Sequence, residues 1–567
     1  MNQRLVNRPG LWGLALPIAC GVASVPAAAQ LLPPQLPSQS DISRERVPQS
    51  LPQAPDFDLR IQTPEKSAVP RSVDELQFQV HAIRVEGAEH YPAAEVDGFF
   101  APLVGRTIVL EDLRAAAARL EARYRGDGFF LSRVFIPPQQ VKDGTLTVRV
   151  VEGYVSAVSV DAEDDGARRR IEKLLRPLVG QKPVRLTDIE SRLLIINDMP
   201  GINGVSVLRP SDDLGAAELV VTSRARPNQY QLSVDNGSSK ALGPWTFGAN
   251  ATLNRPFGRT GALDLAVAAG GRNVREVRSG SIRYAEPIGT RGLTASIGAL
   301  AGVARPGGAI RDLDVDSHVT SFAGRLRYPL VRGRANSLFV DAGLALNRTH
   351  TDVLGTRLIS DKQTVGELTL IWQQNGWMDG LTNASLSLFK GLDILGAMDG
   401  DAPRPSVAGF DPNFTKLNWT IQRAQQLPDR FSAYAIIQGQ YTRDTLLSGE
   451  LISFGGSSIG RGYDPSAIAG DRGIGGTLEL RYDANLDLGP VIGNPQLYVF
   501  GDAARATTRA NGLQPRFTEK LSTLGFGVRF TLIDRIRVDA QLADARRDVL
   551  TEDRRDPRFV IRMGLSL

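Results

Sequence analysis

The sequence predicts two small α+β domains followed by an all-β transmembrane barrel of about sixteen antiparallel strands. A unit of strand, helix, helix, strand and strand, about 75 residues long, occurs twice between residues 78 and 224. From about residue 227 the helical periodicity disappears, and apolar and polar side chains alternate with a period of two. Beyond the first 30 residues no run of about 18 apolar residues occurs, so no transmembrane helix is expected.

Residues 1–29 are predicted to be a cleaved secretory signal peptide. Arg4 and Arg8 precede an apolar stretch over about 11–25, and the alanines that follow fit a small-residue cleavage site. The only cysteine, Cys20, lies inside this segment, so the mature chain would contain none. The alternative, a lipoprotein acylated at Cys20, fits the residues before that position poorly. From these features alone, the exported chain is periplasmic, secreted or an outer-membrane barrel.

Residues 30–77 are predicted to be a proline-rich linker. Eight prolines fall between residues 30 and 70, which favours an extended segment without a packed core. The longest run without proline, 38–47, has room only for a short helix.

The two α+β units are predicted to span 78–152 and 153–224. Each first helix carries apolar residues at i, i+3, i+4 and i+7, which form one face of a helix. These residues are Val96, Phe99, Phe100 and Leu103 in the first unit and Ile171, Leu174, Leu175 and Leu178 in the second. Leu-Val-Gly follows both helices, with glycine as the expected stop signal. Thr187 and Glu190 are expected to form a capping box on the second helix of the second unit. The order of elements alone leaves two generic α+β modules as an alternative.

Residues 225–567 are predicted to form the barrel. The last nine residues alternate strictly, with Phe559, Ile561, Met563, Leu565 and Leu567 on one face. Such a strand fits a soluble sandwich or a membrane barrel, but the 341 residues from 227 to 567 are too many for one ordinary sandwich. At about 21 residues for each strand and its connection, they give about sixteen strands.

Several kinds of site are not expected. The segment 456–460 matches the G-x-S-x-G nucleophile elbow around Ser458, but no helix is predicted after it and all four histidines precede it. Few histidines and no mature cysteine argue against a His/Cys metal site. The net charge of +5 gives no reason to expect nucleic acid, and no phosphate-binding P-loop sequence is present. We therefore predict no enzyme activity, no cofactor and no metal.

Two short motifs in the barrel carry a more specific signal. Arg461, Gly462 and Tyr463 lie in the glycine-rich stretch "IGRGYDPSAIAGDRG", and Phe500 and Asp502 lie in "LYVFGDAARA". Together with the signal peptide, the proline-rich linker and the paired α+β units, they resemble the two-partner secretion transporters. This haemolysin secretion/activation family belongs to the outer-membrane assembly-factor superfamily, and its α+β units are called POTRA domains. The segments 128–155 and 234–239 resemble the end of the first POTRA domain and the first barrel strand.

The resemblance implies an outer-membrane transporter of a Gram-negative bacterium, with its POTRA domains in the periplasm. It would capture an unfolded partner exoprotein (an adhesin, haemolysin or toxin), by adding a strand of the partner to a sheet edge, and export it to the cell surface. Its partners would be that exoprotein and outer-membrane lipid, with no nucleotide or nucleic acid. Alternatives are a barrel assembly factor of the same superfamily, or an uptake porin or receptor with added periplasmic domains.

The resemblance also implies roles for the two motifs. Arg461 would lie at the tip of the long sixth extracellular loop, which folds back into the lumen, and would pair with Asp502 on the barrel wall. A lumen of polar side chains can accept such a loop, whereas lipid cannot. The chain departs from the family pattern in two places. Prolines crowd the region where the family often has a plug helix, and the last residue is Leu567, where phenylalanine is common.

Overall fold

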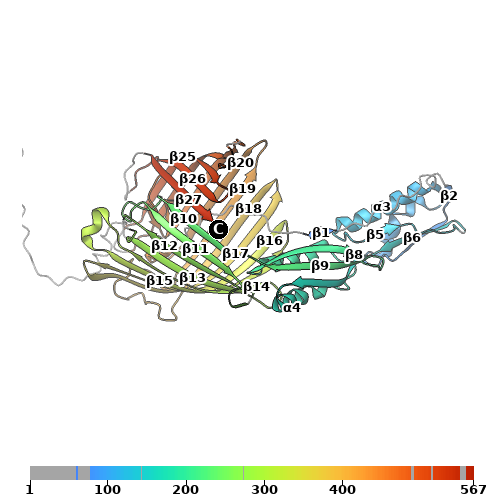
Figure 1. Cartoon of the computed structure of the whole chain (residues 1–567), viewed down its shortest axis with the longest axis horizontal. Coiled ribbons are helices and arrows are strands. Elements are labelled where there is room, and N and C mark those ends of the chain that lie inside the picture. The colour runs from blue at the N-terminus through green and yellow to red at the C-terminus, as the bar shows by residue number, and fades with distance from the viewer. Residues whose placement is uncertain are drawn as a thin grey trace, which may run out of the picture.

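The computed structural model describes residues 59–61, 77–141, 143–258, 260–272, 274–486, 489, 491–493, 495–511, 515–549 and 557–567. The predicted signal peptide 1–29, with Cys20, and most of the predicted linker 30–77 lie outside these residues. The described chain forms an α+β arm at one end and a wide barrel at the other (Figure 1). None of the helices in these ranges is long and apolar enough to cross a membrane.

The first α+β unit is a three-stranded sheet with two helices. Its elements are β2 (Gln77–Gln79), β3 (Ala82–Glu86), α2 (Ala93–Gly98), the 3-10 turn η2 (Ala101–Leu103), β4 (Thr107–Val109), α3 (Leu110–Gly126), β5 (Arg133–Phe135) and β6 (Thr145–Val151). The strand order is β3-β6-β5, with β3 parallel to β6 and β5 antiparallel to it. The short strands β2 and β4 pair separately.

The second unit repeats this plan and gains a strand. Its elements are β7 (Tyr154–Ala162), α4 (Asp165–Leu175), η3 (Arg176–Leu178), α5 (Leu186–Asp198), β8 (Ile202–Pro210) and β9 (Ala216–Ala225). The sheet order is β1-β8-β9-β7, in which β1 (Leu59–Ile61) comes from the proline-rich segment and runs parallel to β8. The linker prediction contained no such strand.

The predicted helical stripes face the two cores. Phe100 is buried in the first core, and Ile171 and Leu175 are buried in the second. Gly105 and Gly180, which follow the two stripes, have φ of +79° and +81°, a left-handed conformation that glycine adopts without strain.

The expected capping box on α5 is wrong. Helix α5 begins at Leu186, so Thr187 lies inside the first turn, and Arg185 takes the N-cap position with no side-chain cap. An N-cap residue needs an extended backbone, and here Arg185 has it, with φ −87° and ψ 142°. The observed N-cap lies two residues before Thr187, so the Thr187 backbone is helical and its hydroxyl lacks the geometry of a cap.

The barrel contains sixteen antiparallel strands among the described residues, as predicted, and it is closed. The strands are β10 (Gln229–Asp235), β11 (Thr246–Asn254), β12 (Ala262–Gly270), β13 (Val277–Ile288), β14 (Leu293–Ala304), β15 (Asp316–Arg332), β16 (Asn336–Val353), β17 (Thr356–Trp377), β18 (Gly380–Leu392), β19 (Thr415–Gln426), β20 (Phe431–Thr442), β23 (Arg472–Asp483), β24 (Gln496–Thr508), β25 (Phe517–Leu532), β26 (Ile536–Ala545) and β27 (Arg558–Ser566). The C-terminal strand closes the barrel by pairing with β10, with Gln231 opposite Ser566. Short 3-10 turns occur at η4 (Pro256–Gly258) and η5 (Gly308–Leu313).

The two faces of each strand differ as the alternation predicts. Leu524 and Phe526 on β25 and Phe559 on β27 are more than half exposed on the outer surface. Arg529, from the opposite face of β25, points into the lumen and pairs there with Asp539, at 3.3 Å. The apolar face is therefore the outer one, as a membrane barrel requires.

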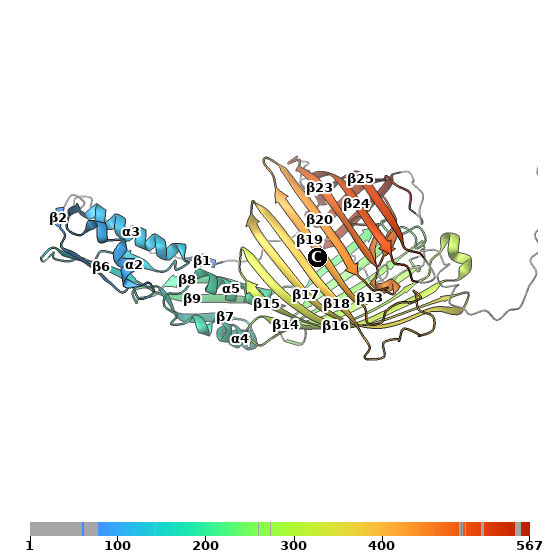
Figure 2. The ribbon, with the colours of Figure 1, turned by 180° about the vertical axis from the view of Figure 1, so that it is seen from behind.

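The second unit contacts the barrel turns at one end. Arg332 at the end of β15 holds Asp198 of α5 through two hydrogen bonds, of 2.6 and 2.8 Å. Arg170 of α4 donates to the backbone oxygen of Pro287, at 2.5 Å. Figures 1 and 2 both show α4, β8 and β9 next to the ends of β14 and β15. The longest connection between barrel strands, 443–471, leaves from the far end of the barrel.

Candidate functional site: the lumenal loop and the barrel wall

The loop 443–471, here called loop 6, folds against the inner wall of the barrel. It connects β20 to β23 and contains the 3-10 turn η6 (Ser448–Glu450) and a hairpin of β21 (Ile452–Phe454) and β22 (Ile468–Gly470). Its buried apolar side chains pack on inward-facing residues of the wall. The cluster comprises Tyr434, Ile436, Phe454, Ile459, Tyr463, Ala467, Ile468, Ala504, Ala506, Leu521, Ala545 and Val549.

The Arg461 guanidinium forms a bidentate ion pair with the Asp502 carboxylate. Its Nε and Nη2 atoms donate to Oδ2 and Oδ1 of the carboxylate, at 3.2 and 2.9 Å. The backbone N–H groups of Gly460 and Arg461 also donate to Oδ2, at 3.1 and 3.0 Å. Asp502 therefore holds both the guanidinium and the backbone of the loop tip. A planar guanidinium suits such a two-point contact, which fixes orientation as well as distance.

The rest of the Arg461 side chain is also held by the wall. Nη1 lies 3.0 Å from Oε2 of Glu479, and Nη2 donates to the hydroxyl of Thr477, at 2.8 Å. The guanidinium carbon lies 3.3 Å from the centre of the Phe500 ring, within the range of a cation–π contact. Arg461 is only 4% exposed and Asp502 only 3%. Burial on this scale makes each partner dependent on the other, because an unpaired buried charge is costly.

Gly462 and Tyr463 fix the next part of the loop. A Cβ atom on Gly462 would lie 2.8 Å from the backbone nitrogen of Ala545, so only glycine fits this approach to β26. The Tyr463 hydroxyl donates to the backbone oxygen of Arg547, at 2.8 Å, and accepts from the N–H of the same residue, at 3.1 Å. Tyr463 is fully buried, and these bonds satisfy its hydroxyl.

The loop tip also reaches the strands where the barrel closes. Arg558 at the start of β27 lies 3.3 Å from the carboxylate of Asp464, and it also donates to the backbone oxygen of Tyr463. Its Nη2 atom donates to the backbone oxygens of Gly237 and Ser238, just beyond β10, at 3.1 and 2.8 Å. One side chain therefore links loop 6, the first strand and the last strand.

Two features of this site were missed from the sequence. Glu479 connects Arg461 to two further cations, Arg481 at 2.7 Å and Arg529 at 2.5 Å. The apolar cluster around Phe454 was also missed, because the loop was read as glycine-rich and charged. A signal for Glu479 exists: Thr477, Glu479 and Arg481 alternate with apolar residues and therefore share the lumenal face.

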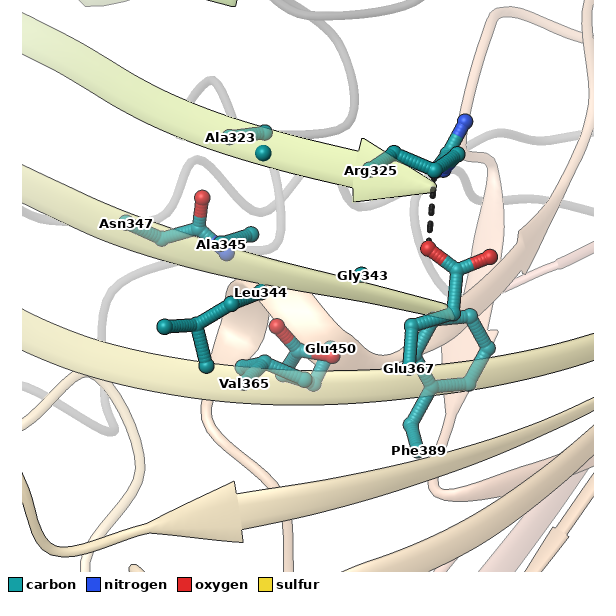
Figure 3. Close-up of a pocket in the computed structure, with 11 residues that line it drawn as sticks. Ala323, Arg325, Gly343, Leu344, Ala345, Asn347, Val365, Glu367, Phe389 and Glu450 are labelled. Carbon is teal, nitrogen blue, oxygen red and sulfur yellow. Dashed lines mark hydrogen bonds and ion pairs between the residues drawn. The ribbon is translucent and has the colours of Figure 1, made fainter. Parts of the chain in front are cut away.

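A small cavity of about 100 Å³ lies in the lumen beside the base of loop 6. Arg325 and Glu367 form an ion pair across it, at 2.7 Å, next to Phe389 (Figure 3). Glu450 of the loop also lines it, and its carboxylate lies 2.7 Å from the buried ammonium of Lys416. Buried polar pairs thus fix the loop at its base as well as at its tip.

The structure does not give Ser458 the surroundings of a nucleophile. It lies in a bend, and a turn rather than a helix follows at residues 461 and 462. The described ranges contain no group of three or more His, Cys, Asp or Glu side chains arranged to hold a metal ion.

Comparison with known proteins assigns the family. Residues 216–530 match the model of the haemolysin secretion/activation protein family ShlB/FhaC/HecB, and residues 78–153 match the ShlB-type POTRA domain. The chain belongs to this family. The resemblance found in the sequence is therefore confirmed, and the barrel is an outer-membrane barrel whose POTRA domain is periplasmic, as in the family.

Individual relatives are distant. The haem/hemopexin transporter protein HuxB of Haemophilus influenzae is 25% identical over 380 residues, which cover 65% of this chain and 66% of HuxB, just under two thirds. The hemolysin transporter protein ShlB of Serratia marcescens is 25% identical, over 73% of each chain. Among solved structures, CdiB of Escherichia coli matches with a TM-score of 0.70 at 19% identity, over 89% of this chain and 93% of CdiB. This structural match supports the same fold.

Proposed function

We propose that this protein exports a partner exoprotein from the periplasm to the cell surface by two-partner secretion. The observation that carries the proposal is the docking of the loop 6 tip on the barrel wall, with Arg461 held by Asp502 inside the lumen. Relatives in the family are described as a hemolysin transporter and as an outer-membrane transporter. In this proposal the exported partner is a secreted protein that is captured unfolded in the periplasm.

The periplasmic units are proposed to capture the partner through their sheet edges. An extended peptide can add to an edge strand through main-chain hydrogen bonds, which tolerate varied sequence. In the second unit β1 occupies the edge at β8, and β7 forms the other edge of that sheet. In the first unit β3 and β5 are the edges of the described sheet. A partner strand therefore has β3 and the part of β7 beyond Val155 available. The chain itself occupies the edge at β8, Glu121 already accepts a hydrogen bond from the N–H of Val134 on β5, and Gly180 donates to the backbone oxygen of Val155.

The proposal includes no catalytic step, no cofactor and no nucleotide. Arg461, Gly462, Tyr463, Phe500 and Asp502 act by positioning loop 6, and they contact no reacting group. Outer-membrane lipid surrounds the apolar outer face, and nucleic acid is not a partner. Folding of the exoprotein outside the cell supplies the drive in this proposal.

A crosslinking experiment tests the route of export. The sequence has one cysteine, Cys20, in the predicted signal peptide, so an introduced cysteine is unique in the mature chain. Asn347→Cys places a thiol at the lumenal cavity, and Ile297→Cys places one on the outer face, where Ile297 is 68% exposed. A stalled exoprotein that carries its own cysteine should form a disulfide with the first variant and not with the second. Equal crosslinking of both variants, or of neither, would contradict passage through the lumen.

A further inference from the structure

The outer face of the barrel carries an unusual pair of cations on β16 and β17. Arg348 and Lys362 are directly opposite one another in the strand pairing, and both are exposed. Each shares its face with outward-pointing apolar residues nearer the middle of the barrel. Leu346 precedes Arg348 by two positions, and Leu368 on β17 is half exposed on the outer surface. The cations therefore lie at the end of the apolar face that is far from the POTRA domain.

A second pair of the same kind lies on β24 and β25. Arg505 is opposite Lys520, and both are exposed. Val499 on β24 and Leu524 on β25, both more than half exposed, lie on the same outer face nearer the middle of the barrel. The arrangement on β16 and β17 is thus repeated elsewhere on the barrel, at the same end.

The protein offers these four cations no partner. Among the described residues, none of the four side chains makes a hydrogen bond or an ion pair. Like charges placed directly opposite one another destabilise a sheet. Lumenal cations of the same barrel do have acidic partners: Arg325 forms an ion pair with Glu367, and Arg529 forms one with Glu479. The four outer cations therefore differ from these lumenal cations, which the barrel itself neutralises.

Strand length places the outer rim, the barrel end that is far from the POTRA domain, above the hydrocarbon core of the membrane. Strand β16 has 18 residues and β17 has 22. At about 3.3 Å per residue and a tilt of about 45°, 18 residues rise by about 40 Å, against an apolar band about 25 Å tall. The strands must therefore pass beyond the apolar band. Arg348 lies beyond Leu346, and Lys362 lies beyond Leu368, in the direction away from the POTRA domain. The two cations therefore lie at the level of the lipid headgroups.

We propose that the two cationic pairs, Arg348 with Lys362 and Arg505 with Lys520, are binding sites for phosphorylated headgroups of the outer leaflet. A phosphate between the two side chains would offset their mutual repulsion, with the guanidinium donating two parallel hydrogen bonds and the ammonium acting as a point charge. The apolar face below each pair would contact the acyl chains of the same lipid. The combination of phosphate above and acyl chains below selects a lipid over a free anion.

The test measures lipid binding directly and does not depend on secretion. The full-length transporter, in detergent with a chelator present, is titrated with bis-phosphorylated lipid A and with lipid A from which the phosphates have been removed. The variants are Arg348→Gln with Lys362→Gln, and Arg505→Gln with Lys520→Gln. The matched control is Arg106→Gln with Arg209→Gln, which removes the same charge from exposed positions of the periplasmic units.

Each rim variant should lose one of the two sites for bis-phosphorylated lipid A and keep the other. The affinity of the lost site should fall about tenfold or more, since each cation near an anionic surface is worth roughly a factor of five. The control should bind like the unmodified protein, and the phosphate-free lipid should bind every form equally weakly. Exchange of the cations, Arg348→Lys with Lys362→Arg, should retain binding and also shows that the barrel is intact.

Unchanged binding by both rim variants, or an equal loss in the control, would overturn the proposal. Equally tight binding of the phosphate-free lipid to the unmodified protein would also overturn it, because the acyl chains would then account for the interaction. Rim variants that keep lipid binding but lose attachment of the exported protein would instead assign the pairs to an acidic segment of that protein.

Discussion

Removing either partner of the Arg461–Asp502 pair should release loop 6 from the wall. The two changes are not equivalent. Arg461→Ala leaves Asp502 with the two backbone donors at Gly460 and residue 461. Asp502→Ala removes the acceptor of all these bonds and leaves both backbone N–H groups and the guanidinium without it. We therefore expect Asp502→Ala to be the more damaging change.

The magnitudes follow from burial. Breaking a buried ion pair by truncating one partner costs about 3–5 kcal/mol. Arg461→Ala should lie near the lower figure and Asp502→Ala near the upper, and water in the lumen will reduce both. The double variant should cost about as much as Asp502→Ala alone, because both changes break the same contact. A coupling of about 3 kcal/mol corresponds to roughly a hundredfold change in the docked population.

Thiol labelling reports loop docking directly. Thr523 on β25 is buried, and its hydroxyl accepts a hydrogen bond from the N–H of Gly462, at 3.3 Å. In the Thr523→Cys protein with loop 6 otherwise unchanged, the thiol should react slowly with a labelling reagent. The added Arg461→Ala or Asp502→Ala change should speed this labelling by one to two orders of magnitude. Val267→Cys on the outer face should react equally in every background. In parallel, the amount of secreted exoprotein is measured and divided by the amount of transporter barrel at the cell surface.

Two results would refute this reasoning. If the two alanine changes are strictly additive in labelling and in secretion, the residues do not act as a pair. If the labelling rate of Thr523→Cys stays at the parent value in both single variants, the apolar cluster alone holds the loop. The Arg461 contacts would then have another role, such as contact with the exported chain.

Four further predictions concern single changes. Tyr463→Phe removes the hydroxyl's bonds to Arg547 and should weaken loop docking by about 1–2 kcal/mol, seen as a moderate rise in Thr523→Cys labelling. Gly462→Ala should match Arg461→Ala in that assay, because its Cβ would meet the backbone of β26. Arg332→Ala removes the bidentate contact with Asp198 and should broaden spin-label distances between the second unit and the barrel. Ser458→Ala should leave secretion within about twofold; loss of an esterase activity would contradict the non-enzyme proposal.

The parts that the sequence predicted depend on local periodicity. The stripe at Ile171, Leu174, Leu175 and Leu178 sets one face of a helix whatever surrounds it, and it lies in the core. The alternation in the last strand likewise sets which side chains face out, and Phe559 is exposed there. Such patterns need no knowledge of distant residues, because each residue's face follows from its neighbours.

The neighbours of Arg461 needed more than periodicity. Alternation places Thr477 and Glu479 on the lumenal face, but their meeting with Arg461 depends on the register of β23 against β24. In that register Thr477 is opposite Asp502, and Glu479 is opposite Phe500. A slip of one residue would turn every one of these side chains to lipid. The pairing of Arg461 with Asp502, 41 residues apart, was expected only through the family resemblance.

Strand β1 could not be predicted from the sequence for a different reason. Its three residues pair with β8 through main-chain groups, and main-chain pairing leaves no side-chain pattern to read. The prolines around it predicted an extended segment, and an extended segment is also what an open sheet edge can accept. The same property that hid β1 in the sequence would let a partner strand of any sequence add at β3 or β7. Specificity for one exoprotein must then come from side chains beside those edges or from the lumen, because main-chain pairing at the edge cannot distinguish one chain from another.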